Sequence, residues 1–477
     1  MVTFNYSRPE RQGISPSTLH RFLDSCEREV HSLYSFTVIK GTTVAAMGYY
    51  DPMKPDQMKI GHSLSKSMNA LAVGIAIGDG TLHLDDRLVT YFPEDLPKEH
   101  DPRVERITVR DLLMMASNSA YTSATFVNVS SNWRSCYLGM KPYAEPGEWF
   151  AYDTGASYML SCLVTKAMGK NSLEVLNERV FPYMGIEGAK WLLDADGNCT
   201  GGWGCYLKAQ DLAKLGRLLL NYGQWEGRQL IPAWFMRQAT TKQIDTYRNP
   251  GMGWPYGYGY QFWRFPEDTF GCFGVFGQLI VCDPKRDLYV TTTGGCTEQE
   301  NQRLLRIITE TIIAEAQQGP IPYEDVEYHS LEKRLAELCL PVADGEADSA
   351  REREYFNGTY SFADNQTGIT SIAFERTAQD ELGIQMVFRG TPVEVHAGHR
   401  RWITSEAPLD TPEHTVHSFT YGWESGSCLT IKQYMCNSSY YKIYHFTFSD
   451  QKVEFSVEQN VSLYGDKPEQ VKSISRQ

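Results

Sequence analysis

The segment "GHSLSKSMNALAVGIAIGDG", residues 61–80, joins a cluster of small polar residues directly to an apolar pattern. Apolar residues between Met68 and Ile75 recur at the three- and four-residue spacing of a helix that is buried on at least one side. Ser63 and Lys66 are three residues apart, so they share a face of that helix at its first turn. The segment therefore predicts a buried helix, ending near Gly80, that begins with a hydroxyl beside an amine.

That pairing has a chemical meaning. The unpaired N–H groups and the positive dipole end of a helix N-terminus favour negative charge on an oxygen placed there. A lysine in a partly dry cleft loses basicity and accepts a proton as a neutral amine. The S-x-x-K pattern itself recurs at Ser330, Ser439 and Ser449, so the pattern alone is not specific. Ser63 and Lys66 stand out because they follow a predicted strand region and open an apolar helix.

The sequence around this helix predicts one mixed sheet built from both ends of a domain. Residues 32–50, "SLYSFTVIKGTTVAAMGYY", read as two strands that turn at Lys40-Gly41. Later strand-like stretches, rich in aromatic and β-branched residues, precede a closing amphipathic helix. Helical spacing dominates between the two ends. The later strand-like stretches are 256–265, 273–284 and 287–295. We expect a domain over 1–320, with a helical subdomain inserted at about 67–250.

The remainder of the chain predicts a second domain. Residues 321–354 contain a charged helix and the polar run "ADGEADSARERE", which is typical of a linker. Residues 355–477 read as many short alternating strands, which predicts an antiparallel β domain, barrel-like or sandwich-like. The predicted fold class is therefore α/β (α+β), a mixed sheet flanked by helices with a helical insertion, followed by this β domain.

Composition excludes several classes of partner. A formal net charge of −13 without a basic run argues against nucleic acid. There is no stretch of about 18 apolar residues to predict a membrane span. Because the first residues lack an apolar signal core and the eleven cysteines include no C-x-x-C pair, we expect a cytoplasmic protein with reduced thiols. We expect a small-molecule substrate and neither cofactor nor metal. Homo-oligomer formation is left open.

Further motifs carry a resemblance to a known family. The blocks that carry it, in chain order, are "HSLSKSMNALAVGIAIGDGTLHLDDRL" (62–88), "ITVRDLLMMAS" (107–117), "PGEWFAYDTGASYMLS" (146–161) and "GWGCYLKAQDLAKLGRLLLNYGQWEGRQLI" (202–231). Together they resemble the serine β-lactamase-like family over roughly residues 10–318. The likeness is to its branch of class C β-lactamases, D-alanyl-D-alanine carboxypeptidases, esterases and 6-aminohexanoate-dimer hydrolases. The resemblance implies a β-lactamase-like transpeptidase fold.

The resemblance also implies roles for individual residues. Ser63 would be the acylated nucleophile, Lys66 would hold its proton network and Tyr152 would be the partner base. The family's Tyr-x-Asn motif ends here in Thr154, which keeps a hydrogen-bonding hydroxyl but not an amide. The family's third motif, Lys-Thr-Gly or His-x-Gly, aligns with a segment that has no cation. The expected oxyanion-hole and substrate-binding residues are Val275, Thr154, Cys272 and Gly274, with the Ser63 and Val275 amides forming the hole.

These observations predict a serine hydrolase that acts through an acyl-enzyme on a small amide, ester or peptide-like substrate. One alternative is a β-lactamase or D,D-peptidase proper, although the missing cation at Cys272 weakens the case for β-lactam turnover. Another is a ligand-binding or sensor module on the same fold with little turnover. We expect substrate specificity to reside in segments 118–145 and 240–256.

Overall fold

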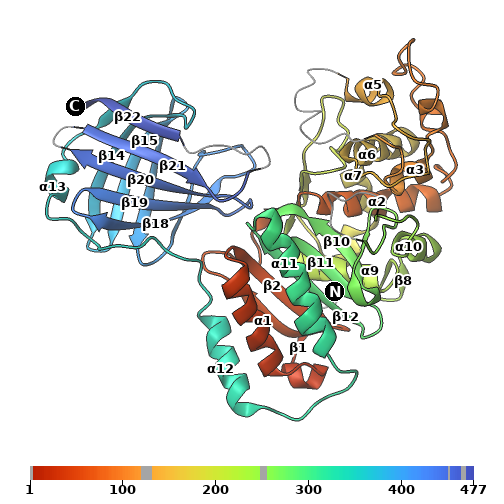
Figure 1. Ribbon diagram of the computed structural model, residues 1–477, viewed down its shortest axis with the longest axis horizontal. Helices are drawn as coiled ribbons and strands as arrows, with labels where there is room; N and C mark the ends of the chain where they lie inside the picture. Colours follow the sequence, from red (N-terminus) through yellow and green to blue (C-terminus); the bar gives the residue numbers. More distant parts are fainter. Residues whose placement is uncertain (1–3, 120–131, 248–254, 450–451, 463–468, 477) are drawn as a thin grey trace.

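The computed structural model describes residues 4–119, 132–247, 255–449, 452–462 and 469–476 (Figure 1). The expected specificity segments lie partly outside these ranges, at 120–131 and 248–254. The described chain forms a sheet flanked by helices and, beside it, a second domain made of strands. None of the helices in these ranges combines the length and apolar composition that a membrane span requires.

The first sheet is mixed, as the sequence predicts. Its seven described strands are antiparallel to their neighbours, except that β1 runs parallel to β3 at one edge. The two ends of the first domain supply it, because β2 pairs directly with β12. The strands, in their order across the sheet, are β1 (Asn5–Tyr6), β3 (Thr43–Tyr49), β2 (Leu33–Lys40), β12 (Leu288–Gly294), β11 (Gln278–Asp283), β10 (Phe270–Gly274) and β9 (Trp263–Arg264).

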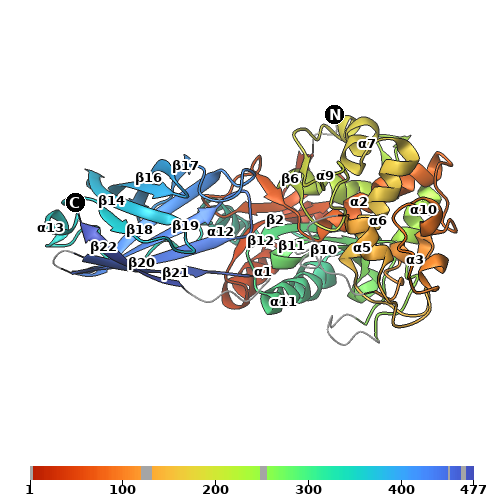
Figure 2. The same ribbon diagram turned by 90° about the horizontal axis from the view of Figure 1, so that it is seen from above.

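Helices cover both faces of this sheet (Figure 2). On one face, α1 packs against α11 and α12. On the other, α9 packs on β11 and β12, while α2 lies against β10 and carries α6 and α7. The expected mixed sheet with a helical insertion is confirmed. The helices are α1 (Pro16–Glu29), α2 (Leu64–Gly78), α3 (Val109–Leu113), α5 (Trp133–Leu138), α6 (Thr154–Met168), α7 (Ser172–Arg179), α8 (Phe181–Met184), α9 (Asp211–Leu220), α10 (Ala233–Ala239), α11 (Glu298–Ile308), α12 (Asp325–Ala336) and α13 (Glu352–Tyr355).

Helix α2 is buried on all sides. Every residue from Leu64 to Ala76 is buried, which is the environment that its all-round apolar sequence demands. Gly74 permits a close helix contact, because a Cβ there would lie 2.5 Å from the ring of Phe235. A small sheet made of β4 (Met58–Ile60), β6 (Cys205–Lys208) and β5 (Lys190–Trp191) fixes the N-terminus of α2. A separate hairpin consists of β7 (Gln224–Trp225) and β8 (Arg228–Gln229).

One expected strand is largely absent. The aromatic stretch 256–265 forms only the two-residue strand β9. Gly257 and Gln261 adopt left-handed backbones, with φ of 98° and 65°, and such residues interrupt an extended strand. The aromatic rings are buried instead against neighbouring loops, for example Tyr258 against Trp263 at 4.8 Å between ring centroids.

The C-terminal domain is a nearly closed, barrel-like sheet, the first of the two forms expected. Ten strands follow one another, and β16 also pairs with β18, which brings the sheet round on itself. A separate apolar cluster fills its interior. The strands are β13 (Tyr360–Phe362), β14 (Ile369–Ala378), β15 (Glu381–Phe388), β16 (Thr391–His399), β17 (Ile403–Glu406), β18 (Val416–Ser425), β19 (Cys428–Met435), β20 (Tyr441–Ser449), β21 (Lys452–Gln459) and β22 (Glu469–Arg476).

The barrel is joined to the first domain by apolar packing. Trp402, Tyr434 and Cys436 come from the barrel but belong to the core of the first domain. Trp402 also donates a hydrogen bond to the Leu340 carbonyl, at 3.2 Å. The interface therefore resembles a continuous core more than a loose contact between domains.

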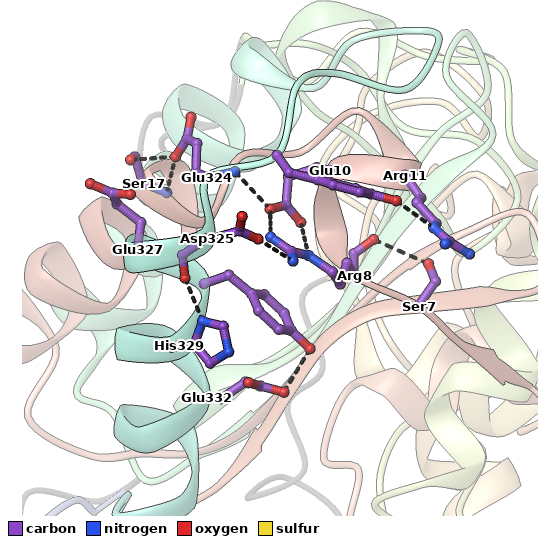
Figure 3. A network of polar contacts seen from close by, with 12 residues as sticks. Ser7, Arg8, Glu10, Arg11, Ser17, Glu324, Asp325, Glu327, His329 and Glu332 are labelled. Atoms are coloured by element: carbon purple, nitrogen blue, oxygen red, sulfur yellow. Dashed lines mark hydrogen bonds and ion pairs between the residues drawn. The ribbon is translucent and has the colours of Figure 1, made fainter.

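A polar network fixes the linker helix α12 to the N-terminal segment (Figure 3). The Arg8 guanidinium pairs with Glu10 and Asp325, each at 2.6 Å. It also lies 4.3 Å and 4.2 Å from the ring centroids of Tyr323 and Tyr328. This network holds the end of the first domain at the point where the chain leaves for the barrel.

Candidate active site

Ser63 stands immediately before α2 with its hydroxyl unused by the helix. Serine at this position ordinarily accepts a hydrogen bond from an amide of the first turn, but the Ser63 side chain makes no such cap. The residue before it, His62, has a left-handed backbone with φ of 46°, which is uncommon for a residue with a Cβ. The Ser63 hydroxyl is therefore left without a capping role.

Lys66 provides the partner of that hydroxyl. Its Nζ donates to Ser63 Oγ at 3.1 Å and to the Gly202 carbonyl at 2.7 Å. The side chain is buried, with 2% exposed, and it forms no ion pair within the described ranges. Burial lowers the pKa of Lys66 to about 7, and the negative charge of Asp153 opposes that effect. The amine is therefore substantially neutral near physiological pH.

Tyr152 completes the group. It lies just before α6, and its ring stacks on the ring of Trp263, with 5.5 Å between the two centroids. Lys66 Nζ lies 4.9 Å from the centroid of the Tyr152 ring. Burial raises the pKa of Tyr152 above its ordinary value, while the side chain of Ser63 acts in the opposite direction. The structure thus brings together the alcohol, the amine and the phenol that the sequence analysis selected.

A buried carboxylate fixes the Tyr152 segment. Asp153 caps α6 through the Gly155 amide at 2.8 Å, and its other oxygen accepts from Ser117, Ser119 and Tyr137 at 3.0–3.1 Å. Burial raises the pKa of Asp153 to about 6, although these hydrogen bonds oppose the shift. Asp153 is the middle residue of the Tyr-x-Asn motif, a position to which the sequence analysis gave no role. Its hydrogen bonds fix the backbone next to Tyr152.

The expected oxyanion-hole residues meet at the same place. A Cβ on Gly274 would lie 2.5 Å from the Gly61 carbonyl and 3.2 Å from the Leu64 amide nitrogen. This close approach sets the end of β10 against the turn that carries Ser63. Val275, the next residue, is partly exposed, as is Ser63. Within the described chain, neither of their amides donates a backbone hydrogen bond, so both are available to a ligand.

The two altered motif positions differ in location. Thr154 is buried at the first residue of α6, and its methyl group would be 2.6 Å from a Cβ on Gly202, so it lies beside Lys66. Cys272 is buried in β10 next to Ser67, and burial raises the pKa of its thiol to about 12. The Cys272 thiol is therefore uncharged and supplies no cation to the site.

Sequence reasoning missed two kinds of contributor. Gly202 accepts from Lys66. It leaves no room for a side chain, because a Cβ would lie 2.6 Å from the Thr154 methyl group and 3.0 Å from the Thr154 carbonyl oxygen. The "GGWG" run at 201–204 was its only signal. Ser439 lies 3.1 Å from the His62 ring, and nothing local in the sequence points to it. In the described ranges, no group of three or more His, Cys, Asp or Glu side chains is placed to hold a metal ion.

Comparisons with known proteins bear on the family and the fold. The sequence model of the family described as Beta-lactamase matches residues 28–296. The 6-aminohexanoate-dimer hydrolase of Paenarthrobacter ureafaciens is 22% identical over 275 residues, which are 53% of this chain and 70% of that protein.

Two solved structures show the same fold at low identity. A penicillin-binding protein homologue from Caulobacter crescentus superposes with a TM-score of 0.52 at 16% identity, covering 64% of this chain and 99% of the other. The octameric penicillin-binding protein homologue from Pyrococcus abyssi superposes with a TM-score of 0.50 at 15% identity, covering 96% and 99%. The second likeness extends over both domains.

Proposed function

The chain belongs to the Beta-lactamase family, and from that premise we propose that it is a serine hydrolase that works through an acyl-enzyme on small amide, ester or peptide-like substrates. One observation carries the proposal. The buried Lys66 amine, with a pKa lowered to about 7 by burial, lies 3.1 Å from a Ser63 hydroxyl that caps no helix. A structural serine and lysine need neither feature.

The acylation step follows from the positions of these groups. Neutral Lys66 accepts the proton of Ser63 as Oγ attacks the substrate carbonyl. The Ser63 and Val275 amides receive the negative charge that develops on the carbonyl oxygen, and each such donor contributes about 2.7–4 kcal/mol where it has been removed. Because burial raises the pKa of Tyr152, its phenol is protonated at neutral pH. We assign it the transfer of a proton to the leaving group, after which the proton that Lys66 took from Ser63 restores the phenol. Water then hydrolyses the acyl-enzyme and gives a proton back to Ser63 through the same groups.

The uncharged environment at Cys272 bears on the substrate class. In the family resemblance, the missing cation is the group that holds a substrate carboxylate, so we propose substrates without an anionic group at that point. Small amides are included because a similar protein is named a 6-aminohexanoate-dimer hydrolase. Two alternatives remain. The protein is a β-lactamase or D,D-peptidase proper, or it is a binding module with little turnover. The following test separates them from the proposal.

The wild-type chain is expected to hydrolyse p-nitrophenyl butyrate with an initial burst of nitrophenol, because acylation by an activated ester outpaces deacylation. Turnover of nitrocefin, a β-lactam with a carboxylate, should be slower in kcat/KM. Stopped-flow absorbance of both reagents makes the comparison. Faster turnover of nitrocefin would favour the β-lactamase alternative, and no nitrophenol release at all would favour a binding module.

Tyr152→Phe tests the leaving-group role. The variant keeps the ring that stacks on Trp263 and loses only the hydroxyl. We expect kcat/KM for a p-nitroanilide to fall about 10²-fold, the lower range for general acid–base groups. An ester of p-nitrophenol should lose much less, because nitrophenolate leaves without a proton. Tyr158→Phe, which removes a hydroxyl bonded to Asp194 at 2.7 Å, is the matched control. Equal losses with both substrates would contradict the role.

A further inference from the structure

We propose that Ser439, from the C-terminal barrel, is a positioning residue of the active site that holds the two backbone turns flanking the oxyanion hole. The proposal rests on the proposed function. It makes the barrel a working part of the catalytic centre, although the family model ends at residue 296.

The turn between β19 and β20, residues 436–440, enters the first domain beside the nucleophile. The Ile60 amide donates to the Asn437 carbonyl at 3.1 Å, and Tyr34 donates to the Ser439 carbonyl at 3.0 Å. Asn460 donates to both the Ser439 and Gly295 carbonyls, at 3.0 Å and 2.8 Å. These bonds fix the backbone of the turn from three directions, so the Ser439 side chain has a defined place.

The Ser439 hydroxyl bridges two residues of the first domain. It is 1% exposed and lies 3.0 Å from Gln278 Nε2 and 3.1 Å from His62 Nε2. The Gln278 amide nitrogen is a donor only, so the hydroxyl accepts from it. Burial, with the nearby charges of His414 and Lys66, lowers the pKa of His62 to about 3. The ring is therefore neutral, and the hydroxyl and Nε2 share one hydrogen bond whose direction is set by the tautomer of His62.

Both bridged residues control a strained turn next to an oxyanion donor. His62 precedes Ser63, and Phe276 follows Val275; the two have left-handed backbones with φ of 46° and 67°. Gln278 Nε2 also faces the carbonyls of Phe276 at 3.1 Å and Gly294 at 2.8 Å, so its two hydrogens are shared among these carbonyls and the Ser439 hydroxyl. A left-handed residue with a side chain persists only where its surroundings hold it. One hydroxyl from the barrel is thus connected to both of these turns.

Aromatic packing joins the same groups. The rings of His62 and Phe276 meet edge to face at 5.0 Å between centroids. Tyr440, the neighbour of Ser439, packs on them at 6.3 Å and 5.8 Å. The Ser439 hydrogen bonds add directional contacts to this packing, one to the His62 ring and one to the Gln278 amide.

Loss of the hydroxyl should affect the transition state more than substrate binding. The oxyanion forms only during reaction, so a displaced donor lowers kcat while KM changes little. Displacement of about 1 Å in an active site costs up to about 10²-fold. For Ser439→Ala we expect kcat for p-nitrophenyl butyrate to fall about 10- to 100-fold with KM within twofold. Ser439→Thr, which keeps the hydroxyl, should recover most of the loss.

The control is Ser418→Ala. Ser418 is equally buried, and among the described residues its hydroxyl bonds to two from the barrel, Thr404 at 2.7 Å and Cys436 at 3.2 Å. This variant should lose stability without losing kcat. Equal kcat for Ser439→Ala and Ser418→Ala would overturn the inference. A wild-type chain that releases no nitrophenol would instead overturn the proposed function on which the inference rests.

A second variant, His62→Phe, covers the case in which Ser439→Ala does not fold. It keeps the ring packing and removes the hydrogen-bond partner of Ser439, so it should reproduce on its own the part of the fall in kcat that acts through His62. Where both variants fold, the double variant should resemble Ser439→Ala alone, because Ser439→Ala already removes the hydrogen bond that His62→Phe removes. An unchanged kcat in His62→Phe, or fully multiplicative losses in the double variant, would overturn the inference.

Discussion

Ser63→Ala is expected to lower kcat/KM for p-nitrophenyl butyrate by at least about 10⁴-fold, because no other group in the site can form the acyl-enzyme. The same change should leave the free energy of unfolding nearly unaltered. An ordinary N-cap serine contributes about 1 kcal/mol, but the Ser63 hydroxyl makes no capping bond. Activity and urea-induced unfolding, measured on the same preparation, test both halves of this expectation.

Ser65→Ala is the matched control, two residues further along. The Ser65 hydroxyl accepts from the Cys205 amide at 3.0 Å and is fully buried, so its loss leaves a buried donor unpaired. We expect that variant to lose about 1–3 kcal/mol of stability and to keep most of its activity. The opposite pattern, with Ser63→Ala active and Ser65→Ala inactive, would contradict the assignment of the nucleophile.

Lys66 is expected to show the second largest effect. Lys66→Ala should lower kcat/KM about 10³-fold, within the range for general acid–base groups. In the wild type, kcat/KM should rise with pH through a midpoint near 7, because burial lowers the pKa of Lys66 to about 7 and only the neutral amine accepts a proton. Lys66→Arg should be as inactive as Lys66→Ala, since a guanidinium does not deprotonate. Initial rates between pH 5.5 and 9 measure the profile.

Lys59 offers a control for this prediction. It is also a buried lysine, with a pKa lowered by burial to about 8, but its Nζ contacts Met53 Sδ at 2.9 Å and the face of Tyr34. Lys59→Met should therefore keep the pH profile of the wild type. A profile that stays flat between pH 6 and 8 in the wild type, or a Lys66→Arg variant with full activity, would contradict the role of Lys66.

Local sequence was sufficient for much of the fold and for part of the site. The three-residue spacing of Ser63 and Lys66 places both on one face of a helix, whatever the rest of the chain does. The strands at 33–49 follow from two strand-like runs separated by the Lys40-Gly41 turn. Tyr152 was different, because its own surroundings resemble many other tyrosines; only the order of motif blocks in the family resemblance singled it out.

The remaining features depend on contacts that leave no local pattern. The aromatic stretch 256–265 has strand composition, but left-handed Gly257 and Gln261 bend it into a loop, and composition does not encode that choice. His62 and Ser439 are 377 residues apart, so neither neighbourhood reveals the other. The sequence likewise did not indicate on which side the barrel would meet the first domain.

The most direct test of the account is to locate the covalent adduct. The wild-type chain is treated with a fluorophosphonate, digested and examined by tandem mass spectrometry, beside the Ser63→Ala variant. The account predicts one stoichiometric adduct, on Ser63, and none in the variant. Equal labelling of the two proteins, or an adduct on a different residue of the wild type, would contradict it.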